Sequence, residues 1–170
     1  MSRIRYQVAV SLDGYIAGPK GEADWIIIDP EIDFGALFAQ FDTFIMGRRT
    51  FETTGAMDSF ASKAKTFVFS RSLEPKKYPT ITIVPEVSEK AVAAIRTQAS
   101  KDVWLFGGGG LFRSFLEAGL VDTVEVAIVP VLLGGGVPLL PHSSQQTQLE
   151  LKSHRVYKSG IVSLEYAVMY

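Results

Sequence analysis

A run of four glycines, set between an apolar stretch and an amphipathic one, constrains this chain more than any other feature. The apolar stretch covers Val103–Phe106, and the glycines are Gly107–Gly110. Four apolar residues then follow at helical spacing, namely Leu111, Phe112, Phe115 and Leu116. We therefore predict a buried strand, a glycine-rich turn and a helix that Gly119 can terminate.

Such a turn can be a tight connection alone, or it can bind phosphate. Glycines let an anion approach the backbone closely, and the unpaired N–H groups of a helix N-terminus attract negative charge. Four consecutive glycines exceed what a tight turn requires, which favours phosphate binding. The run is not a Rossmann fingerprint, because Phe112 stands where the third glycine belongs. It is not a P-loop either, because no Lys-Ser or Lys-Thr follows. A different nucleotide-binding fold is needed.

Two more strand-like segments lead into residues that suit anions. Residues 43–46 lead into Gly47, Arg48, Arg49 and Thr50, and residues 65–69 lead into Ser70 and Arg71. Paired arginines alone are as readily surface charges as ligands. Open α/β sheets, however, bind ligands at the carboxyl ends of strands, and Arg offers a planar fork to phosphate. Three such strand ends suit a dinucleotide with an additional 2′-phosphate, so NADPH is favoured over NADH.

The rest of the chain alternates short β-rich runs with helical patterns, which is typical of an α/β architecture. Additional strands are predicted at residues 4–10, 80–84, 123–129, 149–157 and 161–169, and the last three are expected to form an antiparallel end. A helix is predicted that Asp29 caps, with Pro30 at its first position, and it carries an apolar stripe of Phe34, Leu37, Phe38 and Phe41. Ser88 is expected to cap another helix through Gln98. Residues 133–148 are predicted to form a mobile or partner-facing loop.

Composition narrows the class of protein. The 170 residues, 47% of them hydrophobic, predict one domain spanning 1–170 with one sizeable core. With a net charge of -1, the chain lacks the excess of basic residues that binding to nucleic acid or to an anionic membrane requires. Without cysteine, and with no apolar run near the roughly 20 residues of a membrane span, a cytoplasmic location is expected. His142 and His154 lack ligand spacing, so no metal is predicted.

The chain resembles dihydrofolate reductase over most of its length. The motifs that carry the resemblance are Met46–Glu52 and, far downstream, Phe106–Gly109. The resemblance implies a three-layer α/β fold: a mixed, mostly parallel sheet of about eight strands, an antiparallel C-terminal end and helices on both faces. Val8–Gly18 matches the first strand of that family, which touches the nicotinamide. Two segments, Ser11–Gly14 and Gly119–Asp122 continuing to Pro130–Gly134, are more similar to the riboflavin-biosynthesis reductase branch, the RibD C-terminal domain.

The resemblance implies an NADPH-dependent reductase that transfers hydride to a small N-heterocycle. The chain is most similar to 5-amino-6-(5-phosphoribosylamino)uracil reductase. Two alternative functions are a dihydrofolate reductase that acts on a pterin and a non-catalytic nucleotide-binding protein. For each named substrate, one contact of the family is missing in this chain. Ala23 stands where riboflavin-type reductases carry a serine, and Val126–Ile128 lacks the threonine of the folate enzymes. The predicted cofactor-binding residues are Ala9, Ile16, Gly47, Arg48, Arg49, Thr50, Ser70, Arg71, Phe106, Gly107, Gly108, Gly109, Gly110, Leu111 and Phe112.

The same resemblance suggests Asp33 as the active-site acid, with Glu31 as its rival, because dihydrofolate reductases carry an acid on the first helix. An acid in a first turn is as well explained by the helix dipole. If Asp33 were buried beside Phe34, Phe38 and Trp25, its pKa would be raised and it could pass on a proton. Trp25 matches the tryptophan of the mobile loop, and Trp25 and Phe38 are the predicted substrate contacts.

A homodimer is also expected. Pairing of residues 123–129 or of the C-terminal strands across a two-fold axis would bury strand edges that otherwise invite aggregation. The same exposed apolar surface could belong to an interaction module, which is the third alternative for this chain.

Overall fold

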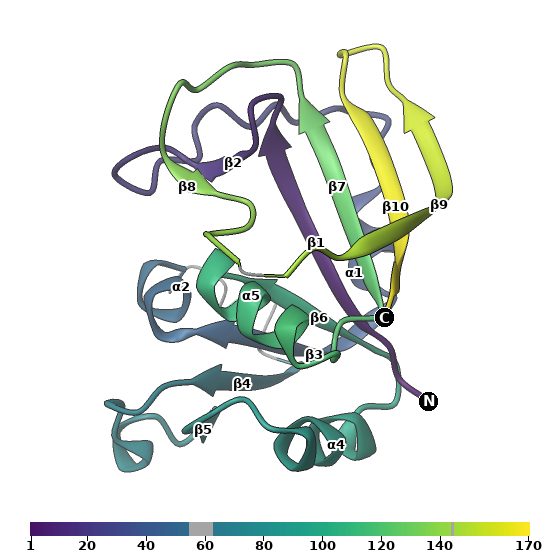
Figure 1. Cartoon of the computed structure of the whole chain (residues 1–170). Coiled ribbons are helices and arrows are strands. Elements are labelled where there is room, and N and C mark those ends of the chain that lie inside the picture. The colour runs from purple at the N-terminus through teal and green to yellow at the C-terminus, as the bar shows by residue number, and fades with distance from the viewer. Residues whose placement is uncertain (55–62, 144) are drawn as a thin grey trace.

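The structure is a computed structural model that describes residues 1–54, 63–143 and 145–170. Its main sheet is built from β1 (Ile4–Ser11), β3 (Phe41–Gly47), β4 (Lys65–Phe69), β5 (Thr82–Val84), β6 (Asp102–Gly107), β7 (Thr123–Val129), β9 (Gln148–Val156) and β10 (Val162–Met169). The strand order is β5-β4-β3-β6-β1-β7-β10-β9 (Figure 1). The strands from β5 to β7 in this order are parallel, and β10 runs antiparallel to both β7 and β9. The predicted mixed sheet with an antiparallel C-terminal end is confirmed.

Helices cover both faces of this sheet. They are α1 (Phe34–Phe38), α2 (Arg48–Thr53), α4 (Glu89–Gln98) and α5 (Gly109–Glu117), and a 3-10 turn spans Pro75–Lys77. Side chains alternate along a strand, so Ile45 packs toward α4 and α5, whereas Met46 packs toward α1 and α2. Three layers result, with α5 in front of the sheet and α1 behind it in Figure 1. None of the described helices is long and apolar enough to span a lipid bilayer.

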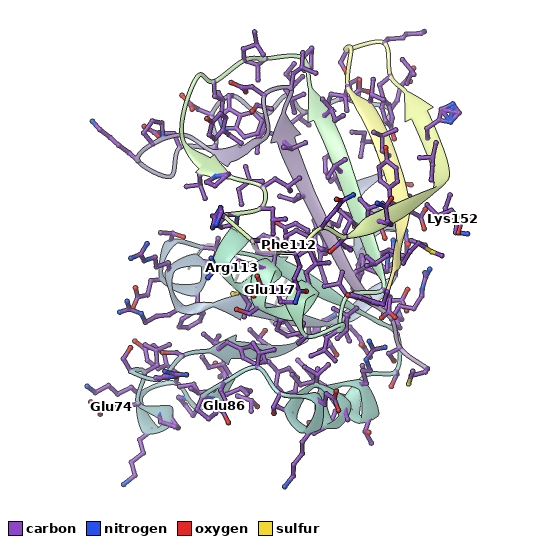
Figure 2. The ribbon with its side chains drawn as sticks, in the orientation of Figure 1. Glu74, Glu86, Phe112, Arg113, Glu117 and Lys152 are labelled. Carbon is purple, nitrogen blue, oxygen red and sulfur yellow. The ribbon has the colours of Figure 1, made fainter. Side chains whose placement is uncertain are left out.

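The core on the α5 side is the larger of the two. Phe112 and Phe115 of α5 are 3% and 0% exposed, and Val92 and Ile95 of α4 join the same cluster. Figure 2 shows Phe112 among the side chains between α5 and the sheet, whereas Glu74 and Glu86 lie at the periphery. The helical spacing that predicts α5 therefore marks its buried face.

The first helix begins later and ends earlier than the sequence predicts, because Phe41 is the first residue of β3. Asp33 is its N-cap, and its Oδ1 accepts a hydrogen bond of 2.9 Å from the N–H of Ala36. Asp29 does not cap a helix, so that prediction is wrong. Its buried carboxylate accepts hydrogen bonds from the N–H of Glu31 at 2.8 Å and of Ser159 at 3.4 Å. Asp29 therefore fastens the segment before α1 to the turn between β9 and β10, because an Asp side chain readily closes a local turn instead of starting a helix.

The segment after β7 is more regular than a loop. Its described part contains β8 (Val137–Pro138), which pairs antiparallel with β2 (Tyr15–Ala17). Gly136 has a φ of +140°, and a Cβ there would overlap the carbonyl oxygen of Ala17. Glycine at this position is what lets the two short strands meet. Ser144, which belongs to the same predicted loop, lies outside the described residues.

Strand order also limits how a dimer could form. β7 is paired on both sides, with β1 and with β10, so the prediction that it could pair across a two-fold axis is wrong. β9 ends the sheet, and its 9 residues are all exposed. The C-terminal strands therefore remain the part of the sheet to which the homodimer prediction applies.

Candidate active site

Parallel strands bring the predicted anion-binding segments to one edge of the sheet. β3 ends at Gly47 and leads directly into α2, while β6 ends at Gly107 and leads through Gly108 into α5. β3 and β6 are neighbours, with Met46 paired to Gly107. A Cβ built on Gly108 would lie 3.6 Å from the Oγ1 atom of Thr50 on α2. The glycine turn and the start of α2 therefore face each other.

The geometry of this edge fits a pyrophosphate group. Gly108 has a φ of +52°, which side-chain-bearing residues avoid. A Cβ at Gly47 or Gly110 would have no other atom within 4 Å, so the space in front of both backbones is open. Among the residues that the structure describes, no side chain caps α2 or α5. The first N–H groups of α5 are thus available to an anion.

The arginines predicted for the cofactor lie at the ends of two neighbouring strands. Arg48 and Arg49 follow β3, and Arg71 follows β4 by two residues; all three are exposed. Arg48 is 3.9 Å from Glu52, a loose contact one helical turn away. The hydroxyl of Ser70 accepts hydrogen bonds from the N–H groups of Ser72 and Leu73, both at 3.1 Å. Ser70 therefore shapes the turn that presents Arg71.

Four other predicted cofactor residues pack into the cores. Phe112 stacks on Tyr6 with ring centroids 3.8 Å apart, so its side chain belongs to the interior. Leu111 and Ile16 pack against the same cluster, and Phe106 packs against Trp104 on the opposite face. The side chain of Phe112 is only 3% exposed, so the prediction for this residue applies to its backbone.

A pocket of about 470 Å³ opens on the face of the sheet that α1 covers. Its volume is in the usual range for small-molecule sites. Its floor is built by the side chains of Gln7, Ala9, Glu125, Ala127, Ser163 and Glu165, from β1, β7 and β10. Phe38 of α1, Trp104 and the segment Ile26–Ile27 form walls. Of the predicted substrate contacts, Phe38 lines this pocket and Trp25 does not. The indole N–H of Trp25 donates to the carbonyl of Glu22 at 3.0 Å.

Asp33 lines the same pocket at the start of α1. The expectation that it is buried beside Phe34, Phe38 and Trp25 is wrong, because Asp33 is exposed. Its rival Glu31 is not part of the lining and faces Arg155 and Lys158, each at 3.9 Å. The structure therefore brings Asp33, and not Glu31, next to the pocket.

A buried ion pair that the sequence does not predict lies under the pocket. Arg5 donates to both carboxylate oxygens of Glu125, from Nε at 2.7 Å and from Nη2 at 2.8 Å. The two side chains are 7% and 9% exposed. The hydroxyl of Thr123 also donates to Glu125, and Arg5 lies 4.6 Å from the ring centre of Phe41. In the sequence, Arg5 and Glu125 each stand as a charge inside an otherwise apolar strand. Only the fold, however, shows that these two residues pair with each other.

Asp13 fixes the loop beyond β7 to the end of β1. Its carboxylate accepts hydrogen bonds from the Ser11 hydroxyl at 2.6 Å and from the N–H groups of Leu133 and Gly134 at 3.0 Å and 2.7 Å. These contacts, with the Ser11 hydroxyl first, lower the pKa of Asp13 below its usual value. Asp13 is therefore a positioning residue for the segment that pairs with β2.

Asp13→Asn is expected to flatten the pH dependence of stability in acid. Because the folded-state pKa is lowered, the stabilisation is fully present above the unfolded value of about 4 and is lost as pH falls through the folded value. Thermal unfolding between pH 7 and pH 3 should show a smaller fall in Tm for Asp13→Asn than for the wild type. Asp24→Asn is the matched control, and it should follow the wild-type curve. Parallel curves for all three proteins would contradict the role given to Asp13.

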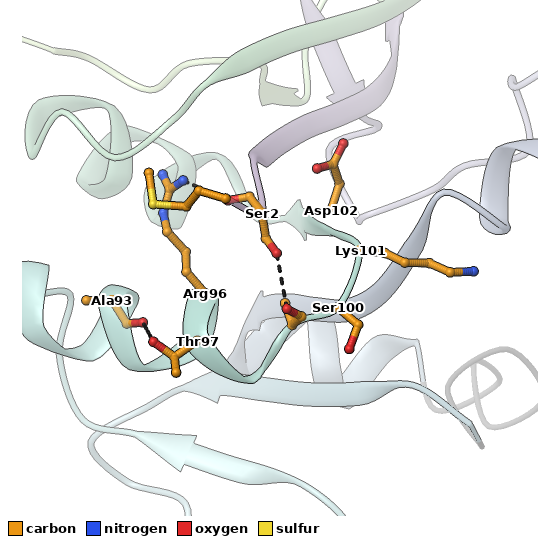
Figure 3. A pocket seen from close by; sticks show the side chains of 9 residues that line it. Ser2, Ala93, Arg96, Thr97, Ser100, Lys101 and Asp102 are labelled. Atoms are coloured by element: carbon orange, nitrogen blue, oxygen red, sulfur yellow. Dashed lines mark hydrogen bonds between the residues drawn. The ribbon is translucent and has the colours of Figure 1, made fainter.

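A second cavity, of about 580 Å³, lies at the opposite end of the strands (Figure 3). It is lined by the N-terminal residues and the end of α4, near the amino ends of β1 and β6. Arg96 donates there to the carbonyl of Ser2 and to Asp122, both at 2.8 Å, so its charge is already engaged. Open α/β sheets bind ligands at carboxyl ends, which makes this cavity a poor candidate.

The strand order, the helices on both faces and the glycine edge together define a dihydrofolate reductase-like α/β fold. The family model of the RibD C-terminal domain matches residues 2–163. The chain therefore belongs to the RibD C-terminal domain family.

Individual proteins are also similar to this chain. The uncharacterized protein YyaP of Bacillus subtilis is 34% identical, covering 96% of this chain and 94% of that protein. The riboflavin biosynthesis protein RibD of Corynebacterium ammoniagenes is 37% identical over 59 residues, which are 35% of this chain and 18% of that protein. A proposed riboflavin biosynthesis protein from Shewanella sp. PV-4 superimposes with a TM-score of 0.84 at 26% identity, over 100% of both chains.

The fold also recurs inside a larger enzyme. A diaminohydroxyphosphoribosylaminopyrimidine deaminase/5-amino-6-(5-phosphoribosylamino)uracil reductase from Thermotoga maritima matches with a TM-score of 0.73 at 16% identity. The match covers 99% of this chain and 57% of that one. At this identity the likeness establishes the fold alone.

Proposed function

We propose that this protein is an NADPH-dependent reductase that transfers hydride to a small N-heterocyclic substrate held in the 470 Å³ pocket. Membership of a reductase family supports the reaction class. The dinucleotide lies along the carboxyl edge of the sheet in this proposal, with its phosphates at the glycine turn and at the arginines that follow β3 and β4.

The observation that carries the proposal is that the pocket and the glycine turn share a strand. Trp104 of β6 lines the pocket, and Gly107 ends the same strand three residues later. On the neighbouring strand, Ala9 contributes to the pocket floor. The resemblance to dihydrofolate reductase assigns Ala9 to the nicotinamide. A cofactor on this edge would therefore reach a pocket of suitable size for a heterocycle.

The residues of the chain supply binding, orientation and water exclusion. NADPH, when bound, supplies the hydride, so the protein needs no covalent nucleophile. The N–H groups at the start of α5 face the phosphates, and Arg48, Arg49 and Arg71 offer charge for the 2′-phosphate. The apolar walls of the pocket, with Phe38 and Trp104, hold the heterocycle flat and displace water from it.

Asp33 has a second task in this proposal, which is to exchange a proton with the heterocycle. Asp33→Asn keeps an N-cap acceptor, so the free energy of unfolding should change by less than about 0.5 kcal/mol. Turnover should nevertheless fall by about 100-fold or more, because the amide cannot donate an acidic proton. Asp33→Ala should lose turnover and also about 1 kcal/mol of stability, measured by urea unfolding. Unchanged turnover of Asp33→Asn would leave only the capping role.

The reaction itself is tested with NADPH that carries deuterium at the transferable C4 position of the nicotinamide. The protein is incubated with this cofactor and, separately, with 5-amino-6-(5-phosphoribosylamino)uracil, its dephosphorylated form and dihydropterin. Mass spectrometry should find one deuterium in the reduced product of at least one acceptor. If NADPH binds but no acceptor is labelled, the protein binds the nucleotide without catalysing this reaction.

A further inference from the structure

The floor of the 470 Å³ pocket carries hydrogen-bond acceptors and carboxylates, and these groups restrict the class of substrate that it can bind. We infer that it selects an unphosphorylated heterocycle whose exocyclic amino or ring N–H groups point toward Gln7 and Glu165. This inference rests on the proposed function and adds to it the chemical character of the acceptor.

Gln7 provides the first observation. Its Oε1 atom is buried and has no hydrogen-bond partner among the described residues, while the residue lines the pocket. A buried amide oxygen without a donor is costly, and such groups are usually satisfied by a ligand or by water. In this inference the amide turns toward the pocket when the substrate binds, and an N–H donor of the substrate then satisfies its oxygen.

The second observation is a pair of carboxylates on neighbouring strands. Glu125 of β7 and Glu165 of β10 are directly opposite each other, and both line the pocket. Like charges in this position repel. Arg5 neutralises Glu125 through two short hydrogen bonds, whereas Oε2 of Glu165 accepts from the neutral hydroxyl of Ser153 at 3.0 Å. A ligand with N–H donors or positive charge would therefore be stabilised over Glu165.

The pocket is at the same time poorly suited to a phosphate. The carboxylates of Asp33 and Glu165 line it, while that of Glu125 is neutralised by Arg5. The basic side chains of the described lining are those of Arg155 and His154. Arg155 lies 4.5 Å from the ring centre of Tyr157 and 3.9 Å from Glu31. The N-terminus of α1, which could attract an anion, is already capped by Asp33. A dianionic group would meet net repulsion here, since phosphate sites are built from arginines and free N–H groups.

The test compares two ligands that differ only in the phosphate, 5-amino-6-ribosylaminouracil and its 5′-phosphate. Their affinities for the NADP⁺-saturated protein are measured by isothermal titration calorimetry, after a separate titration has established that NADP⁺ binds. The riboside is expected to bind at least about tenfold more tightly than the phosphate, because repulsion between the dianion and the carboxylates of the lining carries at least this factor. Tighter binding of the phosphate would overturn the inference.

Two variants locate the effect. Glu165→Gln should weaken riboside binding about tenfold and narrow the difference between the two ligands. Gln7→Met should weaken riboside binding without lowering Tm, because the unsatisfied amide is removed. Glu150→Gln on β9 is the matched control, since this glutamate pairs with Lys152 at 2.9 Å and does not line the pocket. Equal riboside affinities for Glu165→Gln, Glu150→Gln and wild type would refute the role of the pocket floor.

These outcomes separate the inference from the proposed function. Failure of NADP⁺ to bind would defeat the proposed function itself. Binding of NADP⁺ with no preference for the riboside would defeat only the inference about the substrate.

Discussion

Arg5→Met is expected to destabilise the protein by about 3–5 kcal/mol, which makes it one of the two largest effects anticipated here. The substitution leaves the Glu125 carboxylate, whose side chain is 9% exposed, without the guanidinium that holds both of its oxygens. A buried charge without a partner is far costlier than a missing surface contact. Urea unfolding followed by circular dichroism measures the change.

Two comparisons make the Arg5 result specific. Arg3→Met removes a cation that also binds a carboxylate at 2.8 Å, but Arg3 is 49% exposed, so a loss of less than about 1 kcal/mol is expected. In the double variant Arg5→Met/Glu125→Met most of the stability should return, because no buried charge remains. If Arg5→Met and Arg3→Met had the same free energy of unfolding, the buried ion pair would contribute no more to stability than the exposed one.

Gly108→Ala is expected to damage both stability and cofactor binding. A side chain at a φ of +52° strains the backbone by about 1–3 kcal/mol, and relaxation of that strain moves the N–H groups at the start of α5. Losing a charged hydrogen bond to the pyrophosphate should weaken NADPH binding by at least about tenfold. Thermal unfolding and nicotinamide fluorescence measure the two effects separately.

Gly119→Ala is the control for strain alone. Gly119 has a φ of +70° and follows the other end of α5, so the substitution strains the same helix away from the glycine turn. It should lower Tm and leave NADPH affinity unchanged. Equal affinity losses in the two variants would mean that general destabilisation, and not the glycine turn, explains the weaker binding.

The sequence predicts well those parts of the fold that depend on local pattern. The run from Val103 through the glycines to Leu116 predicts β6, the turn and α5, because strand burial, glycine freedom and helical spacing all act within about fifteen residues. The alternation along residues 123–129 and 161–169 predicts β7 and β10 for the same reason. The shared edge of the three predicted anion-binding segments then follows from parallel pairing.

Long-range contacts account for what the sequence does not predict. Asp29 and Pro30 carry a strong helix-start signal, but Asp29 instead binds Ser159, 130 residues away. The pairing of β2 with β8 depends on the close approach of Gly136 to Ala17, which no local pattern encodes. Arg5 and Glu125 are 120 residues apart, and only the parallel register of β1 and β7 makes them partners. The floor of the pocket could therefore not be predicted before its strands were ordered.

The central claim, an NADPH site on the carboxyl edge of the sheet, is tested most directly by titrating the protein with NADPH and NADH in parallel. Nicotinamide fluorescence follows binding to the wild type, Arg48→Ala, Arg71→Ala and the control Lys76→Ala, an exposed cation of the nearby 3-10 turn. We predict that the wild type and Lys76→Ala prefer NADPH by at least about tenfold, as expected for a charged contact to the 2′-phosphate. In Arg48→Ala or Arg71→Ala the NADPH affinity should fall toward that of NADH. Absence of binding of either nucleotide to the wild type would contradict the account.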